Sequence, residues 1–252
     1  MKMRYNTWVI LAVMASVIGS CAHGSKINPH RYQCSERVAK AVKKYDAGKY
    51  ASAKTILDDV KLQCAGNLMM DTAQYYLAMS LVRMKMYTDA KFEFTRLVQD
   101  FPRSPFFEEA QFRMGYCVFK SALPVERDQS ETVEAQKYFR EFLENYPSSS
   151  FADSGQKYLK MAVSRLAEKE FTSAKFYQRI GEKEAAVVYY KSFITEYPAS
   201  LFTVQARLNM GQMLIELGRK AEAREVLDEV VAQEKTGENA RKAQELLARC
   251  KE

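Results

Sequence analysis

The sequence predicts an all-α fold built from about five helix-turn-helix repeats. In each expected repeat an alanine is followed, four and seven positions later, by large apolar residues. These offsets place the three side chains on one face of a helix. Three repeats end in an aromatic residue and a proline, which cannot continue a helix. Because one helical hairpin cannot bury its apolar face alone, neighbouring hairpins are expected to stack.

The alanines mark the second helix of each repeat. The register alanines are Ala53, Ala90, Ala135, Ala186 and Ala223. The apolar residues four positions later are Leu57, Phe94, Phe139, Tyr190 and Leu227, and those seven positions later are Val60, Leu97, Phe142, Phe193 and Val230. A small residue precedes four of the alanines by twelve positions, at Ala41, Ala78, Ala174 and Gly211. The closing pairs are Phe101-Pro102, Tyr146-Pro147 and Tyr197-Pro198.

The five repeats are expected at 34–66, 70–104, 107–149, 152–200 and 202–235, followed by a C-terminal helix that ends by residue 250. Two repeats are longer than the others. In the third, Gly115 precedes Ala135 by 20 positions instead of 12, and the polar stretch Ser121–Glu131 predicts an inserted loop between its helices. Before the fourth repeat, apolar residues keep helical spacing from Tyr158 to Leu166, which predicts an additional or extended helix.

This register resembles the tetratricopeptide repeat, a helix-turn-helix unit with small residues at its contact points. The resemblance implies a superhelical solenoid whose first helices line a concave face. On that face we expect a peptide-binding site, and its candidate residues are Tyr45, Tyr75, Met79, Arg83, Phe112, Tyr116, Phe119 and Lys120. Core packing of these rings is the alternative, above all for Tyr45 and Phe119. The equivalent positions of the last two repeats are more polar, at Lys175, Gln178, Arg179, Gln212 and Glu216.

The N-terminus has the features of a secretory signal peptide over residues 1–20. Lys2 and Arg4 precede an uncharged apolar run, which is shorter than the roughly 20 residues needed to span a bilayer. Ile18-Gly19-Ser20-Cys21 resembles the bacterial lipobox, which implies lipidation of Cys21 and anchoring to a membrane. A soluble secreted protein with an accidental cysteine is the alternative. Ala22 implies, by the same resemblance, sorting to the outer membrane, where the chain would lie on the periplasmic face.

Residues 21–33 are expected to form a flexible tether. The tether holds both histidines, His23 and His30, which without cysteine or acidic partners make a poor metal site. The net charge of +7 is modest, and acidic and basic residues are interleaved, so no nucleic-acid partner is expected. No nucleophile-base set, phosphate loop or metal-ligand spacing occurs, so we expect no catalytic residues, no cofactor and no enzyme activity.

Cys34 and Cys64 flank the first helical hairpin. The two ends of an antiparallel hairpin lie together, and the periplasm is oxidising, so a disulfide between them is predicted. Two free thiols are the alternative. Cys117 lies on the packed side of a predicted helix and is expected to be an inert apolar residue, whereas Cys250 has no evident partner.

The whole pattern resembles the BamD family, the lipoprotein component of the β-barrel assembly machinery. Three phrases carry the likeness besides the lipobox and repeats: G-K-Y-A-S-A at 48–53, F-P-R-S-P-F at 101–106 and A-E-K-E-F-T-S-A-K-F-Y at 167–177. The resemblance implies docking of the C-terminal repeats on the periplasmic domains of BamA, and contacts with other lipoproteins of the machinery. It also implies that the N-terminal repeats receive unfolded outer-membrane proteins through their C-terminal β-signal. Tyr189 stands where the family commonly has an arginine that contacts BamA, so that contact is not assigned to a residue.

A second functional class shares part of this pattern. Periplasmic repeat adaptors of the Tol-Pal-associated type, which coordinate cell-wall synthesis with envelope constriction, also have repeats that end in an aromatic-Pro pair. They usually carry a coiled coil and no lipobox, whereas this chain has Cys21 and no heptads. We therefore favour barrel assembly.

Overall fold

The computed structural model describes residues 29–251. The predicted signal peptide, the lipidation site Cys21 and positions 21–28 of the predicted tether lie outside the described residues. All regular secondary structure in the described part is α-helical. The chain divides into two compact units, the first ending at Leu77 and the second beginning at Ala78, so the boundary falls inside helix α4 (Met70–Arg83).

The first unit contains the hairpin of α2 (Pro29–Asp46) and α3 (Tyr50–Gln63), and the start of α4. Helix α2 begins at Pro29, so the predicted tether boundary at residue 33 was too late. Proline favours the first helical position, where its missing N–H leaves no hydrogen bond unmade. Cys34 and Cys64 form a disulfide that joins the two ends of the hairpin, with Cα atoms 5.8 Å apart.

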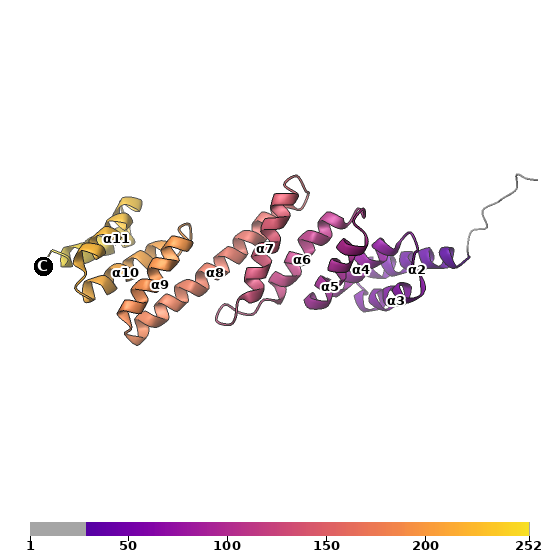
Figure 1. Cartoon of the computed structure of the whole chain (residues 1–252), viewed down its shortest axis with the longest axis horizontal. Helices are drawn as coiled ribbons and strands as arrows, with labels where there is room; N and C mark the ends of the chain where they lie inside the picture. The colour runs from indigo at the N-terminus through magenta and orange to yellow at the C-terminus, as the bar shows by residue number, and fades with distance from the viewer. Residues whose placement is uncertain (1–28, 252) are drawn as a thin grey trace, which may run out of the picture. The chain divides into compact units, whose positions relative to one another are not determined.

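The second unit continues with eight helices in chain order after the end of α4 (Figure 1). They are α5 (Tyr87–Asp100), α6 (Phe107–Ser121), α7 (Ser130–Asn145), α8 (Ala152–Ile180), α9 (Lys183–Glu196), α10 (Thr203–Glu216), α11 (Lys220–Gln233) and α12 (Glu238–Arg249). From α5 onward each helix packs against the next, and α10 also contacts α12. This succession of packed helical pairs confirms the predicted all-α tetratricopeptide-type fold.

The predicted register is confirmed by burial. All five register alanines are 0% exposed, as are the five residues four positions later, and the residues seven positions later are at most 3% exposed. The small residues of the first helices are buried as well. At Gly211 a Cβ atom would lie only 2.7 Å from Cγ of Leu227, so the close approach of α10 and α11 requires glycine there.

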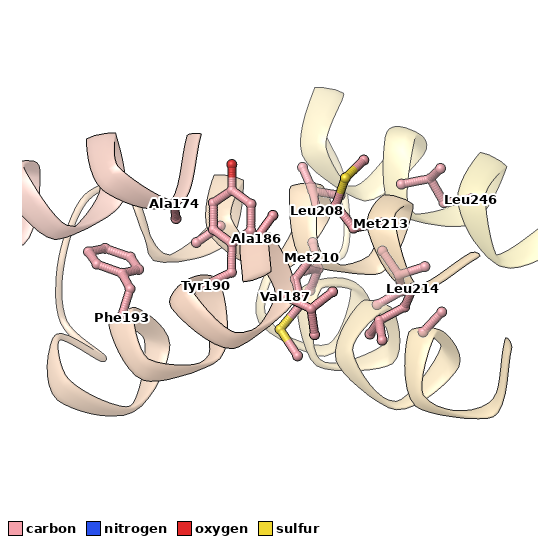
Figure 2. Close-up of a cluster of buried hydrophobic side chains, with 14 of the residues drawn as sticks. Ala174, Ala186, Val187, Tyr190, Phe193, Leu208, Met210, Met213, Leu214 and Leu246 are labelled. Carbon is pink, nitrogen blue, oxygen red and sulfur yellow. The ribbon is translucent and has the colours of Figure 1, made fainter. Parts of the chain in front are cut away.

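Helix α8 shows which of the two options for the fourth repeat is correct. It is one extended helix of 29 residues, about 44 Å long, that ends at Gly181 in the left-handed conformation. Its first half packs with α6 and α7 in one apolar cluster, which includes Phe112, Phe139 and Tyr158. Its second half joins α9 and α10 in another cluster, part of which is drawn in Figure 2.

The predicted insertion in the third repeat is an ordered loop between α6 and α7. Gln129 organises it from a buried position, because its Nε2 donates hydrogen bonds to the carbonyl oxygens of Pro124 at 2.8 Å and Asp128 at 3.1 Å. Its Oε1 accepts a hydrogen bond of 2.7 Å from the Thr132 hydroxyl. Lys169 on α8 donates to the Glu126 carbonyl at 3.0 Å, which ties the loop to the second half of α8.

Candidate peptide-binding surface

Two of the candidate rings on α6 belong to the core. Phe112 is 3% exposed and stacks on Phe151 with ring centroids 5.5 Å apart, and Phe119 is 5% exposed and lies edge-on to Tyr158 at 5.7 Å. Because the extended helix α8 lays Tyr158 against α6, these rings are covered. Phe112 and Phe119 therefore belong to the apolar core beneath Tyr116, and their rings are not free to stack on a ligand.

Tyr116 remains half-exposed beside them. Its ring lies edge-on to Tyr158 at 5.3 Å and to Tyr87 at 6.3 Å. The guanidinium of Arg113 lies 5.7 Å from the ring centroid and the Lys120 ammonium 6.0 Å, so cations border the ring. Burial raises the pKa of Tyr116, so its hydroxyl stays neutral and can donate a hydrogen bond at neutral pH.

Arg165 on α8 completes this surface, although it was not among the residues expected there from the sequence. Its guanidinium lies 4.9 Å from the Phe119 centroid. The Nη1 atom is buried and has no hydrogen-bond partner among the described residues. A buried N–H without a partner is costly, and a carboxylate is the best partner for a guanidinium. We call Tyr116, Phe119, Lys120, Tyr158 and Arg165 the α6–α8 surface.

A sequence signal for Arg165 exists. It lies seven positions after Tyr158, two helical turns further along the predicted extended helix, so it projects from nearly the same side. Arg165 precedes Ala174, the small residue that sets the register of the fourth repeat, by nine positions, so the register around that alanine does not indicate it.

The other candidates lie elsewhere. In the first unit, Tyr45 packs edge-on to Tyr50 and Tyr76 at 5.3 Å each, and Tyr75 is 9% exposed beside Tyr76. In the second unit, Met79 is half-buried and Arg83 exposed on the end of α4. The four candidates on α6 therefore lie together in the second unit. Tyr45 and Tyr75 belong to the first unit.

A second aromatic surface lies where α8 meets α9. Tyr177 and Tyr189 stack with centroids 4.5 Å apart and an interplanar angle of 16°, and their hydroxyls are 3.4 Å apart. Phe176 and Val188 are 46% and 65% exposed. A hollow of about 320 Å³ opens there, bordered by the Glu126–Lys169 link. We call Phe176, Tyr177, Val188 and Tyr189 the α8–α9 face, and grouped exposed apolar side chains of this kind mark protein contacts.

The described residues contain no group of three or more side chains suited to hold a metal ion. Cys117 is 1% exposed, and burial raises the pKa of its thiol to about 12, so it is a poor nucleophile at neutral pH. None of the helices within residues 29–251 is long and apolar enough to cross a bilayer.

Comparison with known proteins places this chain in a protein family. The model of the YfiO family, described as outer membrane lipoprotein, matches residues 32–229. The outer membrane protein assembly factor BamD of Caulobacter vibrioides is 25% identical over 138 residues. That match covers 55% of this chain and 45% of the relative, so the matched part spans under half of the relative's length.

Solved structures of helical-repeat proteins are also similar. The tetratricopeptide-repeat domain of P58(IPK) has a TM-score of 0.44 at 16% identity, covering 86% of this chain and 55% of that one. The TPR2AB domain of yeast Sti1, solved in a complex with pHSP90, has a TM-score of 0.42 at 16% identity, covering 88% and 99%.

Proposed function

Since this chain belongs to the YfiO family of outer membrane lipoproteins, we propose that it is a scaffold and substrate receptor in outer-membrane protein assembly. The similar protein from Caulobacter vibrioides is named an assembly factor, which supports this role. In this proposal Cys21 carries the lipid anchor and the helical repeats lie in the periplasm. The protein acts by binding and carries out no catalysis.

We propose that the α6–α8 surface receives the C-terminal β-signal of unfolded outer-membrane proteins. Such signals end in an aromatic residue and a free carboxylate. The carboxylate would accept hydrogen bonds from Arg165 and Lys120, and the terminal ring would lie against Tyr116 and Tyr158. Cations beside a half-exposed ring carry the proposal, since Lys120 borders Tyr116 and Arg165 lies over Phe119, and a carboxylate is the best partner for such groups.

A peptide titration tests this site. A dye-labelled peptide with a C-terminal aromatic residue and free carboxylate should bind the chain, and its C-terminal amide should bind about tenfold or more weakly. Arg165→Gln should lower affinity for the free acid by about tenfold or more, and should barely affect the amide. Lys160→Gln, an exposed change on the same helix, is the matched control. Tyr116→Ala should also weaken binding. Equal affinity for acid and amide would contradict the site.

We propose further that the α8–α9 face docks on a periplasmic domain of BamA. Support comes from the stacked pair Tyr177–Tyr189, whose Tyr189 is exposed together with Val188, and from the family resemblance, which assigns the C-terminal repeats to BamA. Val188→Ser with Tyr189→Ala should reduce recovery of BamA in co-purification from detergent-solubilised envelopes, while β-signal binding remains. Recovery of Pal or peptidoglycan synthases in place of BamA would instead favour the adaptor of envelope constriction.

A further inference from the structure

A second hollow, of about 950 Å³, lies between α8 and α10. On α8 it is lined by Phe171, Thr172, Lys175, Phe176, Gln178 and Arg179, and on α10 by Gln205 and Asn209. The lining contains two cations and no carboxylate. It shares no residue with the α6–α8 surface, and only Phe176 with the α8–α9 face. We call it the α8–α10 groove.

A hydrogen-bonded chain of polar groups forms one side of the groove. Gln205 Nε2 donates to Asn209 Oδ1 at 2.8 Å, and Asn209 Nδ2 donates to the Tyr190 hydroxyl at 2.9 Å. That hydroxyl in turn donates to Gln178 Oε1. Tyr190 stands in the core with its hydroxyl at the end away from the α9 backbone (Figure 2), and burial raises its pKa, so it remains a donor.

The network holds the side-chain amides in place but leaves some of their hydrogen-bond donors and acceptors unused. A side-chain amide has two N–H donors and an oxygen with two lone pairs. Gln178 contributes only its oxygen to the network, and Gln205 only one N–H. The groove therefore offers both donors and acceptors, which is what the N–H and C=O groups of an extended peptide backbone require.

The two cations are spaced to match an extended peptide. Lys175 and Arg179 are four residues apart on α8, so they are separated by about 6 Å along the helix axis. In an extended chain, residues i and i+2 share a face and lie about 6.6–6.8 Å apart. Lys175 Nζ lies 5.7 Å from the Phe171 centroid and the Arg179 guanidinium 5.7 Å from that of Phe176, which orients both cations.

We propose that the α8–α10 groove binds an extended internal segment of a partner protein with acidic side chains at positions i and i+2. The two carboxylates pair with Lys175 and Arg179, and the peptide backbone between them pairs with the amides of Gln178, Gln205 and Asn209. Charge complementarity selects this occupant, since within residues 29–251 neither cation forms an ion pair. The bound segment differs from a β-signal because it needs no chain terminus.

The experiment titrates the full chain in detergent with short dye-labelled peptides that are acetylated and amidated. A Glu-x-Glu peptide should bind at least about fivefold more tightly than a Gln-x-Gln peptide, the size expected for exposed ion pairs. A Glu-x-x-Glu peptide should bind with an affinity between these two, because its carboxylates project from opposite faces of an extended chain and only one of them can pair with a cation.

Variants locate the binding. Lys175→Gln and Arg179→Gln should each weaken binding of the Glu-x-Glu peptide by about threefold or more, whereas the matched control Lys160→Gln should not. Arg165→Gln should leave this peptide unaffected, which separates the groove from the β-signal site. Equal binding of the three peptides would overturn the proposal, as would equal losses in Lys175→Gln and Lys160→Gln.

Discussion

Replacing Gly211 by alanine should destabilise the chain, although alanine is the better helix former. An added Cβ would lie 2.7 Å from both Cγ and Cδ2 of Leu227 and 3.1 Å from its Cδ1. Ordinary contacts begin at 3.4 Å, so something must move by about 0.7 Å (3.4 minus 2.7). Leu227 is 0% exposed within the core that α10 and α11 share, and it has little room to move.

The net effect is a difference of two terms. Overpacking a core costs about 1–3 kcal/mol, and exchanging glycine for alanine in a helix returns about 1 kcal/mol. Because the overlap at Gly211 is severe, we expect a net loss of about 1–2 kcal/mol in the free energy of unfolding. Gly155→Ala is the comparison, since its nearest contacts are 3.2 Å away, and it should be close to neutral.

A double-mutant cycle isolates the contact. Leu227→Ala removes all three crowding atoms and alone should cost about 2–5 kcal/mol. With both changes the added methyl fills part of the space, so the double variant should be about 1–2 kcal/mol more stable than additivity predicts. Urea unfolding followed by circular dichroism measures all four proteins. A Gly211→Ala protein as stable as the parent, or strictly additive losses, would refute the reasoning.

Three further outcomes are expected. Replacing Cys34 and Cys64 together by alanine should lower the stability of the first hairpin by roughly 3 kcal/mol in the loop-entropy model, measured as a lower urea midpoint than that of the oxidised parent. Gln129→Ala should leave the buried Thr132 hydroxyl without its acceptor, cost about 1–3 kcal/mol and speed limited proteolysis within 122–129; unchanged cleavage there would contradict the role of Gln129 in ordering the loop. Cys117 should resist alkylation at pH 8 in the native chain and react in denaturant, because a thiol with a pKa of about 12 is almost entirely protonated at that pH; equal rates in both states would contradict its burial.

Much of the fold was predictable because its information is local. Ala53 and Ala223 have the same role since each sits where two helices must approach closely, and both are 0% exposed. The aromatic-Pro pairs mark helix ends for an equally local reason, the missing N–H of proline. The start of α2 was misplaced because composition suggested a polar tether, whereas Pro29 is compatible with a first helical turn.

The candidate site was predictable only in part. Phe112 and Tyr116 are one helical turn apart and were expected on the same face, yet Phe112 is buried and Tyr116 half-exposed. The difference comes from α8, which begins at Ala152 and covers the ring of Phe112 more than that of Tyr116. Arg165 escaped notice for the same reason, because its role depends on Phe119 of another helix.

By itself the sequence determined the helical hairpins and the residues that each hairpin buries. Helical periodicity repeated in five copies is sufficient for this, since it decides which side of each helix faces inward. The tertiary structure alone decided which outward residues remain within reach of a ligand. The contact of Arg165 on α8 with Phe119 on α6 joins two helices that are not consecutive in the chain, and no local pattern encodes it.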